Sequence, residues 1–246
     1  MSGSDRHIDR RQPGSSVDGS AGGQGAEVGA FLDKLARTPN VKPAGIRGRL
    51  IFGMDATASR QPSWDRASHL QNQMFLQTGA LGGLDVQLVF FRGFSECKAS
   101  PWVSDSAKLV HYMGRVTCRG GYTQISRILG HCIAETKRRR VNALVYVGDC
   151  MEEKVDELAH LAGELGMLGV PCFVFQEGGE PQARMAFQQI AQLSGGAYCS
   201  FDANSARALR DLLSAVAVYA AGGRPALEDF ARDRGGDVAL LTSQLR

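Results

Sequence analysis

The chain alternates short, continuous apolar runs with longer segments in which apolar residues recur at helical spacing. Runs of about four to eight apolar residues are typical of buried strands, and recurrence every three or four positions predicts amphipathic helices. The expected strands lie at residues 50–54, 86–91, 96–100, 143–147, 172–175 and 197–200. Helical faces are expected around Ala67 and Leu70, across 104–113, and around Ile125 and Leu129, Leu158 and Ala162, Phe187 and Ile190, and Leu212 and Val216.

This order of elements predicts the fold class. Every residue of Ala143–Val147 is apolar, which is typical of a strand covered on both faces by helices. Strands that alternate with helices require right-handed crossovers. We therefore expect an α/β, doubly wound, mostly parallel open sheet with helices on both faces. The segment 96–100 should add one antiparallel edge strand through a turn at Gly93.

The two ends of the chain differ from this central pattern. Residues 1–25 are rich in Gly, Ser, Asp and Arg, so they are expected to form a disordered tail. A short helix and linker are predicted at 26–45, because apolar residues at helical spacing are followed by Pro39 and Pro43. The main domain is expected at 46–222, followed by a polar C-terminal tail at 223–246.

Composition narrows the class of protein. A hydrophobic content of 43% with 22% charged residues excludes a wholly disordered chain. The net charge of +3 comes without a basic stripe interleaved with aromatics, so nucleic acid is not an expected partner. The longest apolar run, 212–221, is about half of what a bilayer requires, so no membrane span is expected. No apolar stretch follows Met1, which favours a cytoplasmic location.

The candidate chemistry lies where ligands bind in such sheets, at the carboxyl ends of the strands. The first strand ends in Asp55-Ala-Thr57-Ala-Ser59, a Gly-rich loop holds Thr123 before its helix, and the strand at 143–147 is followed by Gly148-Asp149. Taken singly, each aspartate could be a helix cap or a turn residue, and Thr123 could cap its helix. Their convergence on one sheet edge favours a binding site.

These three loops resemble the metal-ion-dependent adhesion site of the von Willebrand factor A-type (VWA) family, in its intracellular bacterial form. That site has an Asp-x-Ser/Thr-x-Ser sequence after the first strand, a Thr in a Gly-rich loop, and an Asp after the fourth strand. The matching residues here are Asp55, Thr57, Ser59, Thr123 and Asp149. The resemblance covers roughly 48–220, and departs from the commonest pattern at Thr57, where Ser is usual, and at Tyr122, which separates Gly121 from Thr123.

The resemblance implies a bound Mg²⁺ or Mn²⁺. Thr57, Ser59 and Thr123 would then ligate the ion directly or nearly so, while Asp55 and Asp149 would act largely through water or by orienting the hydroxyls. Hydroxyl and carboxylate oxygens suit such hard cations. Neutral hydroxyl ligands leave the ion electrophilic, so it would hold an Asp or Glu side chain presented by a partner protein.

Two alternatives remain beside this binding module: a metal-dependent phosphohydrolase and a metal-free scaffold with the same fold. A phosphotransferase of the haloacid dehalogenase type needs a second Asp where this chain has Thr57. Neither a phosphate-binding Gly-rich loop ending in Lys-Ser/Thr nor a Gly-x-Ser-x-Gly elbow is present. No His lies in the three loops. We therefore expect no enzymatic activity.

Two further groups lie close to the candidate site. Glu152 and Glu153 are expected to favour the positive N-terminus of the helix that follows them, although they could add charge near the ion. The six cysteines lack Cys-x-x-Cys spacing and are expected to be reduced, mostly buried thiols. Cys97, Cys118 and Cys150 lie near the same sheet edge, which leaves a zinc or redox role as the less favoured alternative.

Overall fold

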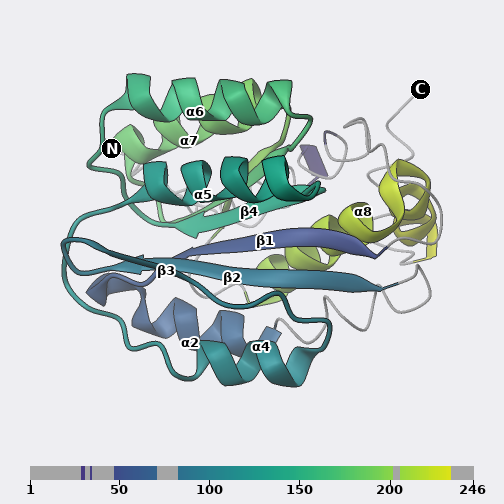
Figure 1. Cartoon of the computed structure of the whole chain (residues 1–246), viewed down its shortest axis with the longest axis horizontal. Helices are drawn as coiled ribbons and strands as arrows, with labels where there is room; N and C mark the ends of the chain where they lie inside the picture. The colour runs from purple at the N-terminus through teal and green to yellow at the C-terminus, as the bar shows by residue number, and fades with distance from the viewer. Residues whose placement is uncertain (1–28, 31–33, 35–46, 71–82, 202–205, 234–246) are drawn as a thin grey trace, which may run out of the picture.

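A computed structural model describes residues 29–30, 34, 47–70, 83–201 and 206–233. Its centre is one six-stranded sheet with strand order β3-β2-β1-β4-β5-β6 (Figure 1). All neighbouring strands are parallel except β2 and β3, which form an antiparallel pair at one edge. The predicted α/β fold with a single antiparallel edge strand is confirmed.

The strands coincide closely with the apolar runs of the sequence. They are β1 (Gly48–Asp55), β2 (Leu84–Arg92), β3 (Glu96–Ala99), β4 (Ala143–Gly148), β5 (Cys172–Glu177) and β6 (Tyr198–Phe201). The register pairs Gly48 with Leu84 and Asp55 with Phe91 between β1 and β2, and Leu50 with Ala143 between β1 and β4. The first strand therefore lies in the middle of the sheet, and its carboxyl end adjoins those of two neighbours.

The helices cover both faces of the sheet. They are α2 (Gln61–Leu70), α4 (Ser106–Met113), α5 (Ile125–Arg138), α6 (Val155–Met167), α7 (Pro181–Leu193) and α8 (Ala206–Asp233), and a short 3₁₀ turn η1 (Ala58–Arg60) precedes α2. Helices α5, α6 and α7 lie on one side of the sheet, and α2 and α4 on the other (Figure 1). None of the helices in the described part of the chain is long and apolar enough to cross a membrane.

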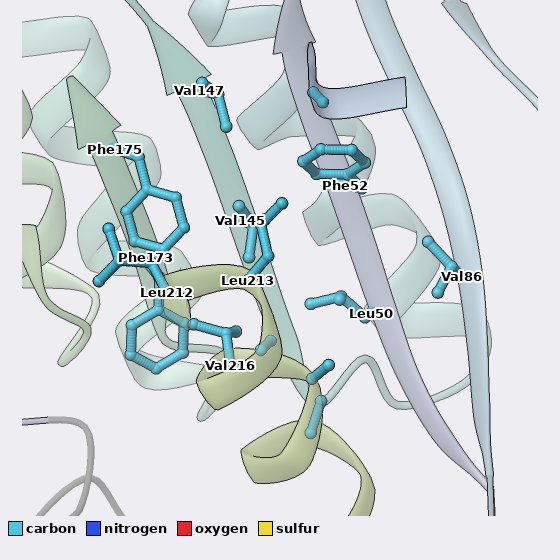
Figure 2. Packing of buried hydrophobic residues seen from close by; sticks show 14 of the residues in the cluster. Leu50, Phe52, Val86, Val145, Val147, Phe173, Phe175, Leu212, Leu213 and Val216 are labelled. Carbon is cyan, nitrogen blue, oxygen red and sulfur yellow. The ribbon is translucent and has the colours of Figure 1, made fainter. Parts of the chain in front are cut away.

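Alternate residues of the central strands build two separate cores. Leu50 and Phe52 of β1 pack with α8 in one cluster, where Leu213 and Val216 approach Val145 of β4 (Figure 2). Ile51 packs on the opposite face against α5. Because strand side chains alternate between faces, a strand with every residue buried needs helices on both sides. The continuous apolar runs follow directly from this double burial.

The last helix differs from the sequence expectation. It was expected to end by residue 222, but helical structure resumes after Gly223 and continues to Asp233. Gly223 has φ 75°, a left-handed conformation that interrupts the helix and that glycine adopts without steric cost. Leu227 is buried in the same core as β1. Apolar packing therefore anchors the helix after Gly223, although its sequence looks mostly polar.

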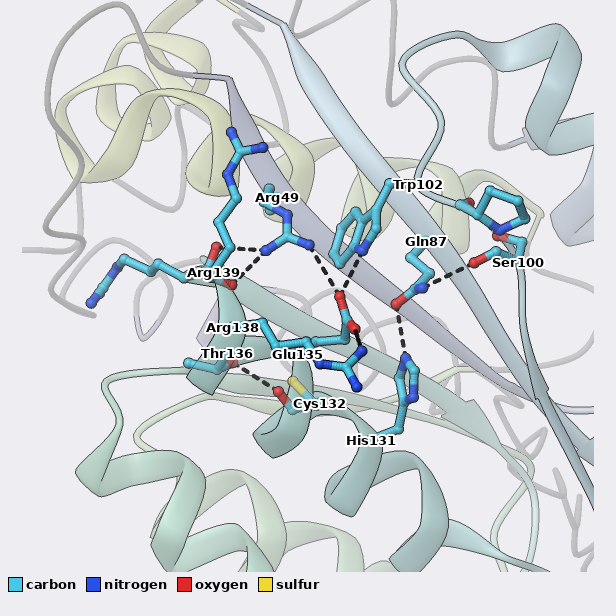
Figure 3. Close-up of polar contacts among 12 residues, drawn as sticks. Arg49, Gln87, Ser100, Trp102, His131, Cys132, Glu135, Thr136, Arg138 and Arg139 are labelled. Atoms are coloured by element: carbon cyan, nitrogen blue, oxygen red, sulfur yellow. Dashed lines mark hydrogen bonds and ion pairs between the residues drawn. The ribbon is translucent and has the colours of Figure 1, made fainter.

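A buried polar network holds α5 against the sheet (Figure 3). Glu135 of α5 accepts hydrogen bonds from Arg49 of β1 at 3.2 Å and from the Trp102 indole at 2.8 Å. The Arg49 guanidinium carbon lies 3.8 Å from the centre of the Trp102 ring. A buried carboxylate requires such partners, and the cation over the aromatic face adds attraction. This network positions the helix whose N-terminal loop carries Thr123.

Several predictions fall outside the described residues. These are the tail at 1–25, most of the helix and linker at 26–45, and the final residues 234–246. The domain boundaries therefore stay predictions.

Candidate metal centre

Asp55 is the last residue of β1 and is fully buried between the neighbouring strand ends. Its Oδ1 accepts a 2.7 Å hydrogen bond from the Thr57 backbone N–H, which bends the chain directly after the strand. In the described part of the chain, its Oδ2 is buried and has no hydrogen-bond partner. A buried carboxylate oxygen without a partner is costly, so its position indicates a ligand that the polypeptide does not supply.

The environment of Asp55 disfavours its negative charge. Burial raises the pKa of this carboxyl to about 6, and the nearby Asp149 carboxylate acts in the same direction. The Thr57 hydrogen bonds and the Arg60 guanidinium oppose the shift but do not cancel it. A bound cation would reverse this balance, since an opposite charge favours the ionised carboxylate.

Asp149 and Ser59 join the first and third loops. The Ser59 hydroxyl donates to Asp149 Oδ2 at 2.8 Å, and the Thr57 and Ser59 hydroxyl oxygens lie 3.4 Å apart. Asp149 Oδ1 is buried and, among the described residues, has no hydrogen-bond partner. Four of the five candidate residues therefore gather at the carboxyl ends of β1 and β4, as the sequence predicts.

Gly148 is required at the end of β4. A Cβ built there would lie 2.4 Å from the hydroxyl oxygen of Tyr146, whose side chain is buried beneath the loop. A larger residue would require either the buried Tyr146 side chain or the loop to shift. The glycine before Asp149 is thus part of what places that carboxylate.

Thr123 is held by the loop that follows Asp149. Its backbone N–H donates to Glu152 Oε2, and its hydroxyl oxygen accepts from the Glu152 backbone N–H, both at 3.0 Å. The N-cap of α5 is Gln124, which makes no side-chain capping bond. Thr123 is therefore buried and connected to the site loop, and it does not cap its helix.

The backbone of the Gly-rich loop also touches the first loop. The Arg119 N–H donates to the Ala56 carbonyl at 3.0 Å. On its other side, a Cβ at Gly121 would lie 2.0 Å from the Gly93 carbonyl oxygen, so only glycine allows this close approach to the β2–β3 turn. The Gly-rich loop that contains Tyr122 is therefore in contact with both the first loop and the β2–β3 turn.

The prediction for Glu152 and Glu153 is wrong about the helix. Neither stabilises α6, which begins only at Val155. Glu152 binds the Thr123 N–H, and Glu153 accepts from Ile125 N at 2.5 Å and Ser126 N at 2.9 Å. Carboxylates that accept from unpaired N–H groups do stabilise the positive end of a helix. Here that helix is α5, which lies beside the loop in space.

Replacing Glu153 with Ala is expected to lower the free energy of unfolding by about 1–2 kcal/mol, because two N–H groups of α5 lose a charged acceptor. Urea unfolding with chelator present measures this. Glu157→Ala, which removes an exposed carboxylate from the first turn of α6, is the matched control and should change stability little. Equal losses in both variants would contradict the assignment to α5.

Cys150 lies beside the candidate site, although the sequence favoured a buried thiol without a role there. One ligand atom from each of Asp55, Asp149 and Cys150 can be chosen so that all three lie within 4.8 Å of one another. Burial raises the pKa of the Cys150 thiol to about 12, with Asp149 and Asp55 adding to the effect. The only sequence signal was its place directly after Asp149. All six cysteines are free thiols, as expected, but only three are buried and the other three are half-buried, fewer buried than the sequence predicts.

An aromatic pair is exposed beside the Gly-rich loop. Phe94 in the β2–β3 turn is 75% exposed and Tyr122 is 60% exposed. Their ring centres lie 5.4 Å apart in an edge-to-face arrangement. The Gln124 amide donates to the Gly93 carbonyl at 3.2 Å, which ties the two supporting segments together. Two large apolar side chains are therefore presented to solvent on a rigid support.

Comparison with known proteins gives the fold class. No family model matches the sequence, and no curated protein matches it. Among solved structures, the SpRpn10 VWA domain is similar with a TM-score of 0.53 and 14% identity, over 68% of this chain and 94% of that one. The vWF domain of the pili tip protein Mfa5 from Porphyromonas gingivalis gives a TM-score of 0.55 and 9% identity, over 71% and 96%.

Proximal thread matrix protein 1 from the mussel byssus, in a structure with a zinc-occupied adhesion motif, is similar with a TM-score of 0.53 and 16% identity. The match covers 72% of this chain and 47% of the mussel protein. At these identities the likeness concerns the fold. The chain therefore has the VWA fold, as its sequence pattern predicts.

The residues of the site fit a divalent cation. Two buried carboxylate oxygens lack partners among the described residues, and two hydroxyls lie beside them. Such hard oxygen donors suit Mg²⁺ or Mn²⁺, which retain water in part of their coordination shell. The arrangement can hold an ion and leave a position open to an outside ligand.

Proposed function

We propose that this chain is a divalent-metal-dependent protein-binding module. A Mg²⁺ or Mn²⁺ ion held by Asp55, Thr57, Ser59, Thr123 and Asp149 would accept an Asp or Glu side chain from a partner protein. The observation that carries the proposal is a pair of buried oxygens at adjoining strand ends, Asp55 Oδ2 and Asp149 Oδ1, which have no hydrogen-bond partner among the described residues. A cation between these carboxylates would relieve both their mutual repulsion and their desolvation.

Three of the five proposed ligand residues are neutral, which favours an acidic outside ligand. The hydroxyls of Thr57, Ser59 and Thr123 carry no charge, and the carboxylates of Glu152 and Glu153 are engaged by N–H groups around the start of α5. Among the proposed ligands only Asp55 and Asp149 offset the charge of the ion, so the ion would still accept a further anionic ligand. A carboxylate from a second protein is a suitable ligand for a hard cation.

The exposed Phe94–Tyr122 pair supports a protein as the partner. Tyr122 directly precedes the proposed ligand residue Thr123, so the aromatic pair includes a residue of the same loop. Exposed apolar groups beside a polar anchor are typical of protein interfaces, in which a few aromatic residues contribute most of the binding energy. A partner would then bind through its acid at the ion and an apolar side chain at the aromatic pair.

Thr57→Val and Thr57→Ser form a matched pair that tests the ion site. The Thr57 hydroxyl lies 3.4 Å from the Ser59 hydroxyl and also interacts with the Asp55 carboxylate, so Val should change metal-free stability by about 1 kcal/mol. Val should weaken Mg²⁺ or Mn²⁺ binding by about 10–100-fold, whereas Ser keeps the oxygen and should bind as wild type does. Calorimetric titration measures both. Unchanged affinity in the Val variant would remove Thr57 from the ligand set.

Partner binding is tested by immobilising the full chain, capturing proteins from extract of its native cells in Mg²⁺, and eluting with chelator. The proposal expects chelator-sensitive capture that Thr57→Val loses. Acidic residues of each captured protein are then replaced one at a time, and one replacement should abolish binding. Capture that persists in chelator would contradict an ion-mediated contact and favour the metal-free scaffold.

The aromatic pair should affect partner binding without affecting the ion. A Phe94→Ala/Tyr122→Ala variant is expected to bind the identified partner more than about tenfold more weakly, at unchanged ion affinity. Met167→Ala/Met185→Ala, which removes exposed apolar side chains from α6 and α7, is the control. If both double variants bind the partner as wild type does, the partner does not use this surface.

We also propose that the site does not turn over a substrate. Metal-assisted hydrolysis needs a group that activates water or carries a proton. His131 lies on α5 and is engaged at 2.9 Å with the Gln87 side chain of β2, in the network that supports the helix. A phosphatase and esterase screen checks this, and metal-dependent turnover that Thr57→Val abolishes would overturn it. The cytoplasmic location stays a prediction.

A further inference from the structure

A sulfur atom lies among the oxygens of the candidate metal centre. Ligand atoms of Asp55, Asp149 and Cys150 lie within 4.8 Å of one another. Asp55 is fully buried, and its Oδ2 has no hydrogen-bond partner in the described part of the chain. The cysteine is therefore grouped with a carboxylate that has one oxygen without a hydrogen-bond partner among the described residues.

We propose that Cys150 is a direct ligand of the ion at this site, and that its sulfur makes the site prefer Zn²⁺ over Mg²⁺. This inference rests on the proposed metal centre and concerns which ion that centre takes. It adds a residue that is absent from the five-residue motif of the sequence.

The separations are within reach of a zinc site. In tetrahedral coordination, zinc–sulfur bonds of about 2.3 Å and zinc–oxygen bonds of about 2.1 Å place the sulfur and an oxygen about 3.6 Å apart. The three ligand atoms here lie within 4.8 Å of one another, an upper limit that exceeds this by about 1.2 Å. Side-chain rotations that close this difference would bring the three atoms into one coordination shell.

The chemistry of the donor set then decides the preference. Mg²⁺ binds oxygen ligands and gains little from sulfur, whereas Zn²⁺ accepts thiolate, carboxylate and hydroxyl-type oxygen together. When the zinc–sulfur bond forms, the Cys150 thiol releases its proton to solvent. The bound dication favours this loss, because it offsets the negative charges of the two neighbouring carboxylates.

The loop that carries Cys150 is held in place on both sides. Asp149 before it accepts from Ser59, and Glu152 after it exchanges two hydrogen bonds with Thr123. Part of the conformational entropy that a metal ligand loses on binding is therefore already lost in the folded protein before the ion binds. Cys118 is a half-buried thiol on the Gly-rich side of the site and lies outside the three-residue cluster, so it offers a matched control.

Cd²⁺ is the probe, because it binds like zinc and its bond to a thiolate gives an ultraviolet charge-transfer band. The full chain, kept reduced, is titrated with Cd²⁺ while absorbance is followed, and Zn²⁺ and Mg²⁺ affinities are measured by calorimetry. Wild type should show the band. Cys150→Ser should lose it and bind Zn²⁺ at least about tenfold more weakly at similar Mg²⁺ affinity, while Cys118→Ser should match wild type. Cys150→Ala serves if the Ser variant folds poorly.

Each result decides between the two proposals. Loss of the band in Cys150→Ser and also in Asp55→Asn supports Cys150 as a ligand in this centre. Cd²⁺ binding without a band, or a band that survives Cys150→Ser, overturns the inference and leaves the oxygen-based metal centre standing. Absence of binding of Cd²⁺, Zn²⁺ and Mg²⁺ to wild type at millimolar concentration overturns both.

Discussion

Asp55→Asn should make the metal-free protein more stable and abolish its response to divalent ions. The carboxylate is fully buried, one of its oxygens has no partner among the described residues, and burial raises its pKa to about 6. A shift of about two units from the ordinary value corresponds to about 3 kcal/mol against the charged form. Asn keeps an oxygen for the Thr57 N–H and carries no charge, so a gain of about 1–3 kcal/mol is expected near neutral pH.

The stability difference between wild type and Asp55→Asn should depend on pH, and the direction follows from the raised pKa. A carboxyl whose folded pKa is raised contributes stability that is fully present below its unfolded pKa of about 4 and is lost as the pH rises through about 6. With chelator present, wild type and Asp55→Asn should therefore have similar stability near pH 4, and the variant should be more stable at about pH 7.5. Urea unfolding at both pH values measures the difference.

Two outcomes would contradict this account of Asp55. Equal stability of wild type and variant at the higher pH would show that the carboxylate carries no desolvation cost. A variant that is still stabilised by Mg²⁺, Mn²⁺ or Zn²⁺ as strongly as wild type would show that the ion does not bind there. If Asp55 lowers the stability of the metal-free protein and is required for ion binding, its role is functional and not structural.

Arg60→Met is expected to destabilise the fold by about 3–5 kcal/mol, the cost typical of removing one partner from a buried ion pair. Arg60 lies in η1 directly after Ser59, is 1% exposed, and forms an ion pair with Glu177 at the end of β5. The variant leaves the Glu177 carboxylate buried without this guanidinium. Chemical unfolding with chelator present measures the loss.

A double variant distinguishes the contribution of the Arg60 charge from that of its packing. Arg60→Met/Glu177→Gln removes both charges and should recover most of the loss, because burying two neutral groups avoids the desolvation of an unpaired ion. Lys137→Met breaks the pair with Glu164, where Lys137 is 61% exposed, and should cost less than about 1 kcal/mol. If the double variant is as unstable as Arg60→Met, the guanidinium stabilises the loop by packing and not by its charge.

The sequence predicts the sheet well because burial on both faces leaves a direct pattern. A strand such as β4 must be apolar throughout, and its boundaries are visible in the composition. The antiparallel edge strand was also predictable, since Gly93 marks a tight turn between two strands. The helix beyond Gly223 was not, because only a few apolar residues, Leu227 with Ala226 and Phe230, anchor a stretch that otherwise looks polar.

The candidate site was only partly predictable, for a different reason. Asp55 and Asp149 follow strands whose carboxyl ends must adjoin in a parallel sheet, so their proximity follows from the topology. The hydrogen bond between Glu153 and the N-terminus of α5 joins the loop after β4 to a helix that precedes β4 in the chain. Nothing in the sequence near Glu153 indicates this contact. Cys150 had only a weak signal, its place directly after Asp149, because its proposed role depends on where its sulfur lies relative to Asp55.

Calorimetric titration of wild type and Asp55→Asn with Mn²⁺, Mg²⁺ and Zn²⁺ tests the metal centre most directly. The account predicts one ion bound per wild-type chain, with a rise in unfolding temperature that follows occupancy, and neither effect in the variant. Absence of binding to wild type at millimolar ion, or equal binding by both proteins, would contradict it.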